Sequence, residues 1–242
     1  MLVFANTDIG MSRNMNQDYY YISNQDDDLS IFILADGMGG YNGGEIASKI
    51  AVESARKYIE EKADDLQNNE KKIIDVLKSS TAYANNTVYE ISKENKNLEE
   101  MGTTLEICLI YNKKVYISHI GDSRVYSIIG EKIERLTTDH SYVEKLVKDG
   151  TITREEAENH PKKHVLIKAL GCVPEIEPDI IERKFEKNEI LVICSDGLTN
   201  MLKDDKIRDV VINNIEDPEK ELIKEANLAG GYDNITAIII RQ

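Results

Sequence analysis

Five aspartates lie where an apolar stretch of the chain begins or ends, and their carboxylates are its clearest reactive groups. Asp36 ends the apolar run ILA, and five of the next eight residues are glycine. A hard carboxylate beside accessible glycine backbone suits a cation that prefers oxygen ligands. Asp196 ends a second apolar run in the same way, and three further aspartates lie in turns beside apolar runs: Asp18, Asp122 and Asp233.

The glycine-rich stretch itself does not match the common phosphate-binding loops. Gly39 and Gly44 have the spacing of a P-loop, but Glu45 and Ile46 follow where Lys and Ser or Thr would meet the phosphates. A dinucleotide fingerprint would need glycine at position 42, which is asparagine. The carboxylate, and not the loop, therefore carries the chemistry.

Several carboxylates at one place would need a cation. Carboxylates within about 5 Å of each other repel and raise each other's pKa, and divalent cations remove that penalty. Two metal ions about 3.5–4 Å apart are a recurrent device for hydrolysing phosphate esters. A single Asp-Gly after a strand is usually a plain turn, so the hypothesis depends on these strand ends meeting.

The elements that would position these residues are short strands interrupted by longer helices. Strand-like runs are rich in Ile, Val, Leu and Tyr, and they occur at 2–8, 19–23, 29–35, 103–111, 114–120, 124–129, 180–186, 189–195 and 234–241. Helical periodicity is found at 44–62, 70–94, 204–213 and 217–229, with a helix-rich insertion at 139–176. This pattern predicts an α+β fold with layered antiparallel sheets, and residues 1–242 as one domain.

Composition excludes several classes of protein. A net charge of −14 argues against nonspecific nucleic-acid binding, which relies on Lys and Arg. The three cysteines are odd in number and widely spaced, which fits a reducing compartment and predicts a cytoplasmic protein. No stretch approaches about 20 apolar residues, so no membrane span is expected.

Seven short motifs in order resemble the PPM/PP2C family of metal-dependent protein serine/threonine phosphatases, in its bacterial single-domain form. The resemblance spans nearly the whole chain. The motifs are RNMNQD (13–18), DGMGGYNGGEIAS (36–48), MGTT (101–104), GDSR (121–124), DHS (139–141), SDGL (195–198) and DN (233–234).

The resemblance implies a four-layer αββα sandwich with two Mn²⁺ or Mg²⁺ ions between the edges of its sheets. Asp36 would bridge the ions, the Gly37 carbonyl would bind one of them, and Asp18 would support the cluster. Asp196 and Asp233 would bind the other ion.

Two further residues take their roles from the same resemblance. Arg13 would bind the substrate phosphate, and Asp122 would bind a weaker third metal together with Asp196. A pairing of Asp122 with Arg124, or a simple turn cap, is the alternative. Gln17 replaces a glutamate common in the family, so its water contact would be made by an uncharged amide.

The segment 141–171 is expected to form a mobile helical flap beside the metal channel, with Gly150 as a break and His160 in a loop. A surface helical hairpin without a role is the alternative for the flap.

His119 is predicted to be a packed residue within a strand, whereas His140 could form a hydrogen bond near the channel.

The implied reaction is hydrolysis of phosphoserine and phosphothreonine by a water that bridges the two metals, without a protein nucleophile. None of the three cysteines has the arginine of a C-x₅-R loop. The expected partners are phosphorylated proteins and a cognate Ser/Thr kinase, and the protein is expected to be a monomer. Two alternatives remain: a phosphatase of small phosphometabolites at the same centre, and a non-catalytic phosphoprotein-binding regulator.

Overall fold

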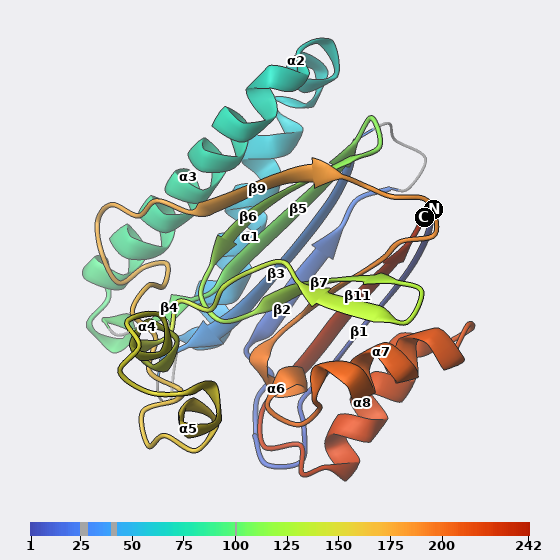
Figure 1. The fold of residues 1–242 in the computed structure, drawn as a ribbon. Coiled ribbons are helices and arrows are strands. Elements are labelled where there is room, and N and C mark those ends of the chain that lie inside the picture. Colours follow the sequence, from blue (N-terminus) through green and yellow to red (C-terminus); the bar gives the residue numbers. More distant parts are fainter. Residues whose placement is uncertain (25–28, 40–42, 100) are drawn as a thin grey trace.

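The computed structural model describes residues 1–24, 29–39, 43–99 and 101–242. Two β-sheets lie face to face, with helices on both outer sides (Figure 1). Gly40 and Tyr41 of the glycine-rich stretch lie outside the described residues. The predicted four-layer α+β sandwich is confirmed.

The first sheet joins the two ends of the described chain. Its strand order is β1-β11-β10-β7-β8, and all neighbours are antiparallel. The first and last strands are paired along their whole length, from Leu2 opposite Arg241 to Asp8 opposite Ile235. The bounds are β1 Leu2–Asp8, β7 Arg124–Ile129, β8 Lys132–Arg135, β10 Ile190–Cys194 and β11 Ile235–Arg241.

The second sheet has the order β2-β3-β5-β6-β9, with the two-residue strand β4 paired to the end of β3. A tight turn with Asn112 and Lys113 at positive φ joins β5 to β6, as the sequence predicts. The bounds are β2 Asp18–Ile22, β3 Ser30–Met38, β4 Gly102–Thr103, β5 Leu105–Tyr111, β6 Lys114–Ile120 and β9 Asp179–Lys184.

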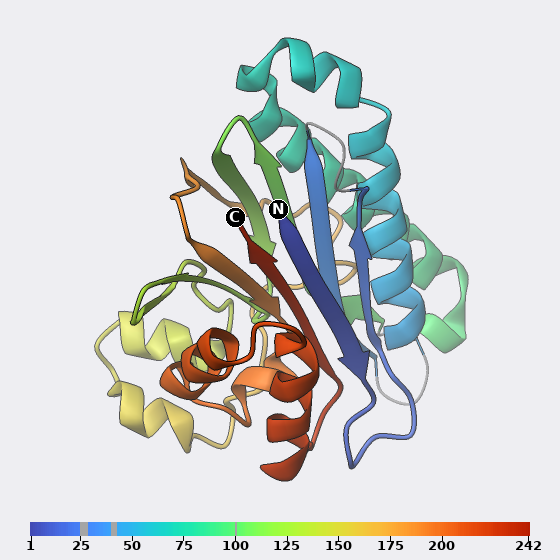
Figure 2. The same ribbon diagram turned by 90° about the vertical axis from the view of Figure 1, so that its right-hand side faces the viewer.

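The helices cover the outer faces of the sheets. Helices α1 and α3 pack on the second sheet, and α7 and α8 pack on the first, which Figure 2 shows from the side. The bounds are α1 Gly44–Glu60, α2 Ala63–Asn68, α3 Ile73–Glu94, α4 Tyr142–Lys148, α5 Arg154–Glu158, α6 Asp196–Thr199, α7 Asp204–Asn213 and α8 Pro218–Leu228, with 3₁₀ turns at Glu70–Lys72 and Lys96–Leu98.

Strand β3 is apolar on both faces because it lies between two packed layers. Ile33 and Ala35 pack toward the helices α1 and α3, whereas Phe32 and Leu34 pack toward the other sheet. Burying each large side chain contributes about 1.5–3 kcal/mol relative to leaving it exposed. This apolar run therefore fixes the register that ends at Asp36, at one edge of the sandwich.

The segment 139–176 is less helical than its composition predicts. It contains only the two short helices α4 and α5 among turns, since each helix is ended within two turns by a glycine or asparagine. Ser141 caps α4, and Thr153 caps α5 through a reciprocal bond with Glu156. The four-residue strand β8 is also absent from the elements predicted from the sequence.

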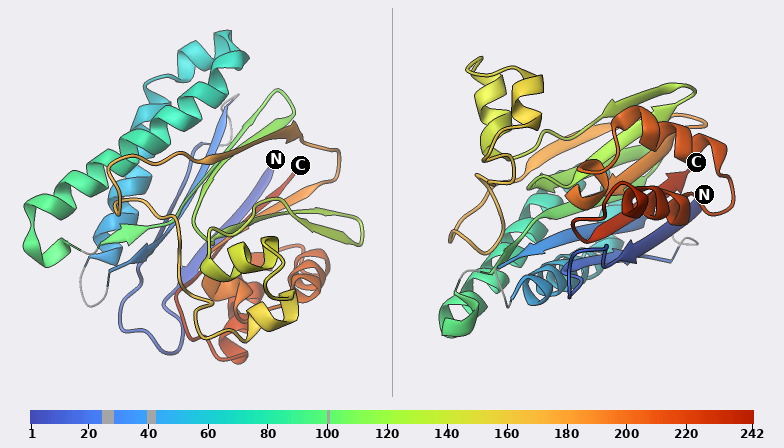
Figure 3. Two further views of the ribbon diagram at one scale, coloured as in Figure 1. Left: turned by 60° about the vertical axis from the view of Figure 1, so that its left-hand side comes forward. Right: turned by 90° about the horizontal axis from the view of Figure 1, so that it is seen from below.

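Helices α4 and α5 stand apart from both sheets at one end of the molecule, away from the two chain ends (Figure 3). They belong to the segment 141–171, which we call the flap. No helix among the described residues is long and apolar enough to cross a membrane.

Candidate metal and phosphate site

The backbone of Asp36 is held by two threonines of the MGTT motif. The N–H of Asp36 donates to Thr104 Oγ1 at 2.9 Å. Its carbonyl accepts from Thr103 Oγ1 at 2.8 Å and from the Thr104 N–H at 2.9 Å. The backbone at the end of β3 is therefore fixed independently of the Asp36 carboxylate.

Asp18 lies opposite Asp36 and ties the two sheets together. The two residues are register partners in β2 and β3. Asp18 Oδ2 accepts from Ser195 Oγ at 2.7 Å and from Thr236 Oγ1 at 2.6 Å, both on the other sheet. Its Oδ1 is buried and has no hydrogen-bond partner among the described residues.

Gly37 must be glycine because the start of α1 passes directly beside it. A Cβ at Gly37 would lie 2.0 Å from the Gly44 carbonyl oxygen, which is far inside contact distance. The Gly37 N–H donates to the Gln17 carbonyl at 3.1 Å. The Asp-Gly pair thus lets three chain segments meet next to the Asp36 carboxylate.

A second close approach explains the Asp-Gly pair that begins α6. A Cβ at Gly197 would lie 2.0 Å from the Asn234 carbonyl oxygen, so this position also requires glycine. The contact brings Asp196 next to the turn that contains Asp233. Asp196 Oδ2 accepts from Asn200 Nδ2 at 3.0 Å.

Asn234 is a functional residue whose individual role was not predicted from the sequence. Its side-chain amide donates to the carbonyls of Ile9 and Met15, each at 2.9 Å, and its Oδ1 accepts from the Gln17 N–H at 2.8 Å. These bonds fix the loop that carries Arg13. The DN motif was the available signal, but only its aspartate was given a role.

Arg13 points into the carboxylate site. Its guanidinium donates to Asp233 Oδ2 at 2.7 Å, and half of the side chain is exposed. This hydrogen bond raises the pKa of Arg13, with smaller contributions from Asp196 and Asp36. An exposed cation that faces a group of carboxylates is suitably placed to contact a phosphate.

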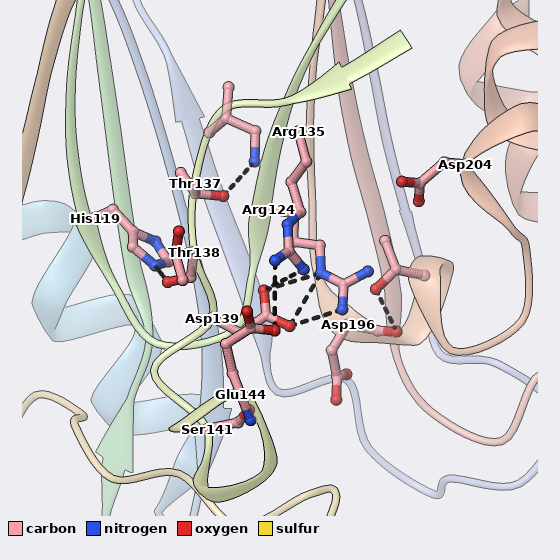
Figure 4. A network of polar contacts seen from close by, with 12 residues as sticks. His119, Arg124, Arg135, Thr137, Thr138, Asp139, Ser141, Glu144, Asp196 and Asp204 are labelled. Atoms are coloured by element: carbon pink, nitrogen blue, oxygen red, sulfur yellow. Dashed lines mark hydrogen bonds and ion pairs between the residues drawn. The ribbon is translucent and has the colours of Figure 1, made fainter. Parts of the chain in front are cut away.

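Asp122 lies in the turn between β6 and β7 and lines a cavity of about 670 Å³, which Asp196 also lines. Charged side chains of the flap and of β7 and β8 form the other walls. Figure 4 shows Asp139 of this cavity between the guanidinium groups of Arg124 and Arg135.

The electrostatics show that the predicted carboxylates gather at one place. Burial raises the pKa of Asp36 well above its ordinary range, and the charges of Asp18, Asp196, Asp122 and Asp233 raise it further. Burial likewise raises the pKa of Asp18 to about 7. Burial first, and then a neighbouring carboxylate, raise the pKa values of Asp122 and Asp196. Within the described residues, no group of three or more His, Cys, Asp or Glu side chains is placed so that it could hold a metal ion.

These features fit a divalent cation. The donors are hard oxygens, Asp18 Oδ1 is buried without a partner among the described residues, and Gly37 leaves room for close approach of the backbone. A nearby cation would lower the raised pKa values of these carboxyl groups and return them to their ionised forms. The site residues Asp18, Asp36, Gly37, Asp122, Asp196, Asp233 and Arg13 thus lie around one edge of the sandwich.

The flap residues named from the sequence lie away from this group. Gly150 has a φ of +70° and follows α4 with open space around it. His160 Nδ1 accepts from the Lys162 N–H at 3.1 Å, and its ring contacts Tyr142. His164 of the flap lines the cavity beside Asp196.

The other titratable residues singled out in the sequence are largely internal. His119 is fully buried, as predicted, and His140 donates its backbone N–H to the Gly121 carbonyl next to Asp122. Cys108 and Cys194 are buried, while Cys172 is exposed.

Comparison with known proteins agrees with this geometry. The chain matches the family model for Protein phosphatase 2C over residues 11–227. It is 37% identical over 239 residues to protein phosphatase PhpP of Streptococcus pneumoniae, covering 97% of this chain and 94% of that protein.

Two solved structures extend the comparison. Serine/threonine phosphatase Stp1 from Staphylococcus aureus superposes with a TM-score of 0.91 at 32% identity, covering 99% of this chain and 94% of that chain. The catalytic domain of the serine/threonine protein phosphatase PstP, in complex with two manganese ions, superposes with a TM-score of 0.82 at 29% identity, covering 98% of this chain and 96% of that chain. By sequence, fold and the arrangement of its carboxylates, this chain belongs to the protein phosphatase 2C family.

Proposed function

We propose that this protein is a metal-dependent phosphatase that hydrolyses phosphoserine and phosphothreonine in proteins. The observation that carries the proposal is the convergence of five aspartates and Arg13 at one edge of the sandwich. Relatives across the full chain are named protein phosphatase and serine/threonine phosphatase. A non-catalytic regulator would not need all of these carboxylates, and their mutual repulsion would only destabilise it.

The metal centre is proposed to hold two Mn²⁺ or Mg²⁺ ions. Asp36 would contribute to both positions, the Gly37 carbonyl to one, and Asp196 and Asp233 to the other. Asp18 would support the cluster through Oδ1, which has no hydrogen-bond partner among the described residues. The two manganese ions in PstP support this number. When bound, such ions supply an activated water and positive charge for the phosphoryl oxygens.

Arg13 is proposed to bind the substrate phosphate. In the structure its guanidinium contacts Asp233, so this arginine and the proposed metal ligands share one edge of the site. A phosphate dianion is a better partner than one shared carboxylate, because it offers several oxygens to the planar guanidinium. Arg13 would therefore orient the phosphate for attack opposite the leaving hydroxyl.

Asp122 is proposed to bind a third, weaker ion together with Asp196. The guanidinium of Arg124 is bound to Asp139 and Tyr126, which argues against the alternative that Asp122 simply pairs with Arg124. An Asp122→Ala variant should keep two ions and lose the weakest one, as counted by calorimetric titration with Mn²⁺. If the variant still binds three ions, the assignment is wrong.

The substrates are proposed to be proteins because the cavity beside Asp196 is large and bounded by charged side chains from the flap. A cavity of about 670 Å³ can accept residues that flank the phosphorylated one. We further propose that residues 1–242 act as one domain, and that the flap, including Gly150 and His160, selects among protein substrates.

The biological setting follows from this chemistry. Protein phosphoesters require a kinase, so we propose a cognate Ser/Thr kinase that shares its substrates. The three free cysteines support a reducing compartment, the cytoplasm.

We propose a monomer, since large exposed apolar side chains such as Leu2, Ile215 and Leu228 lie on different elements. Light scattering during size exclusion would test the oligomeric state.

The deciding experiment is release of phosphate from a phosphothreonine peptide with Mn²⁺, and again after exhaustive chelation. Phosphoserine, phosphotyrosine and sugar phosphate substrates in the same assay separate a protein phosphatase from a phosphatase of small metabolites. Activity only with Mn²⁺ or Mg²⁺, and highest on phosphothreonine and phosphoserine, is expected. Equal rates after chelation would contradict the metal centre.

A further inference from the structure

The turn that carries Asp122 is held from both sides by two consecutive residues of another segment. Arg124 Nε donates to Asp139 Oδ1 at 3.0 Å, and Arg124 Nη2 donates to Asp139 Oδ2 at 2.7 Å. The His140 N–H donates to the Gly121 carbonyl at 2.7 Å, and His140 Nδ1 accepts from the Gly121 N–H at 3.1 Å. Both backbone groups of Gly121 and the whole guanidinium edge of Arg124 are therefore engaged.

His140 can accept at Nδ1 only while its ring is neutral, and its surroundings keep it neutral. Burial, together with the nearby His119 and Lys168, lowers the pKa of His140 to about 4. The ring stacks on His119 at a centroid distance of 4.5 Å. Since Nδ1 accepts, the proton lies on Nε2, which faces Asp179 at 3.2 Å.

Thr138, the residue before Asp139, connects this segment to the buried pair of His119 and Glu106. His119 Nε2 lies 2.8 Å from the Thr138 carbonyl, so this nitrogen must be the donor. His119 Nδ1 lies 2.5 Å from Glu106 Oε1, and both side chains are fully buried. Burial lowers the pKa of His119, but the Glu106 carboxylate outweighs it and the pKa is raised overall. Residues 138–140 are thus anchored where β5 begins and β6 ends in the second sheet.

The same segment leads directly into the flap. Asp139 Oδ1 also accepts from Arg135 Nη1 at 3.4 Å. The Arg135 guanidinium lies 3.4 Å from Glu144 of α4, and Glu144 in turn accepts from Arg154 of α5 at 2.9 Å. A chain of alternating charges therefore runs from the Asp122 turn to both flap helices.

We propose that Asp139 and His140 are positioning residues of the phosphatase site: they hold the turn that presents Asp122, and they connect that turn to the flap. The inference rests on the proposed function for the role of Asp122. It assigns to Asp139 and His140 no contact with substrate; they act through Gly121 and Arg124.

Two matched variants test the role of Asp139. Asp139→Asn removes the charge that binds Arg124, whereas Glu144→Gln loosens only the flap end of the same chain of charges. Loss of a residue that orients a metal ligand typically costs about 10–100-fold in affinity or activity. In calorimetric titration, Asp139→Asn should weaken the lowest-affinity Mn²⁺ site at least about tenfold, while Glu144→Gln changes it less than about twofold. Both variants should speed tryptic cleavage within the flap.

A second pair of variants, at His140, tests the inference even if Asp139→Asn does not fold. His140→Asn retains an acceptor oxygen near the position of Nδ1, and His140→Leu removes it. Mn²⁺ affinity should be largely retained in the first and reduced in the second. The inference fails if Asp139→Asn, once folded, binds Mn²⁺ as Glu144→Gln does, or if the two His140 variants bind it equally. A wild-type protein that binds Mn²⁺ but releases no phosphate would contradict the proposed function and not this inference.

Discussion

Replacing Asp18 by asparagine should change how the stability of the metal-free protein depends on pH. The carboxylate is buried, and burial raises its pKa from the ordinary 3.8 to about 7. Between these two pH values the folded protein binds a proton that the unfolded chain does not bind. The free energy of unfolding therefore falls as pH rises through this window, and the penalty is complete above about pH 7. The amide of the Asp18→Asn variant would not ionise, yet its oxygen can still accept from Ser195 and Thr236.

The expected magnitude follows from the size of the shift. One pKa unit corresponds to about 1.4 kcal/mol, so the full shift destabilises the metal-free protein by about 4 kcal/mol at most. Moving from about pH 5.5 to about pH 8 spans roughly half of the window and should cost the wild type about 2 kcal/mol through Asp18. For a chain of this size that equals about 4–8 °C in melting temperature.

The assay is thermal unfolding of both proteins in chelator over this pH range. The wild type should melt at a higher temperature at about pH 5.5 than at about pH 8, and Asp18→Asn should lose about 4–8 °C of that difference. His119 and His140 also have shifted pKa values, but both proteins contain them. Their contribution to the pH dependence of stability therefore cancels in the comparison. Added Mn²⁺ should stabilise the wild type more at the higher pH, because protons compete with the metal. Parallel pH curves for the two chelated proteins would refute the reasoning.

Four further outcomes are expected. Asp36→Asn and Asp196→Asn should each lower turnover at least about 10²-fold at saturating Mn²⁺, because each weakens the ions that stabilise the transition state; near-normal turnover in both would reject the ligand assignment. Arg13→Ala should mainly raise KM, since Arg13 would contact a phosphate already charged in the ground state; an unchanged KM with a much lower kcat would show that it acts in the transition state. Alkylation of the exposed Cys172 should leave activity largely intact, and stoichiometric inactivation without unfolding would reopen a cysteine mechanism. Shortening the flap, residues 141–171, should alter rates on phosphoproteins far more than on p-nitrophenyl phosphate, whereas equal effects would indicate simple structural support.

Apolar runs and helical periodicity within short stretches of the sequence were sufficient to predict most of the strands and helices of the sandwich. Strand β3 is an unbroken apolar run because both of its faces are buried, and such a run ends visibly at Asp36. The turn at Asn112 and Lys113 lies in the short gap between two predicted strands. Helix α3 was predicted from its helical periodicity. Strand β8 was missed because only one of its four residues, Ile133, is apolar.

Long-range polar contacts could not be predicted in this way. Nothing near Glu106 in the sequence indicates that it would be buried beside His119, since that pairing depends on the register between β5 and β6. The pairing of Arg124 with Asp139 likewise spans the hairpin formed by β7 and β8. The carboxylates of the site were found because each ends or begins an apolar run, whereas the residues that hold them in place carry no such mark.

The pairing of β1 with β11 has a consequence for the order of events during synthesis. Within residues 1–242, β1 is the first strand and its neighbour in the sheet, β11, is the last, so β11 is made after all the other strands described here. Thr236, which holds the carboxylate of Asp18, is also in β11. Contacts between such distant parts of a chain form late, because the intervening segment must first be ordered. A growing chain that has not yet released residues 235–241 would leave β1 and one edge of β10 unpaired and Asp18 without its second hydroxyl donor. The proposed metal site should therefore form only once residues 235–241 are free, and a growing chain that lacks them should not act on phosphorylated proteins.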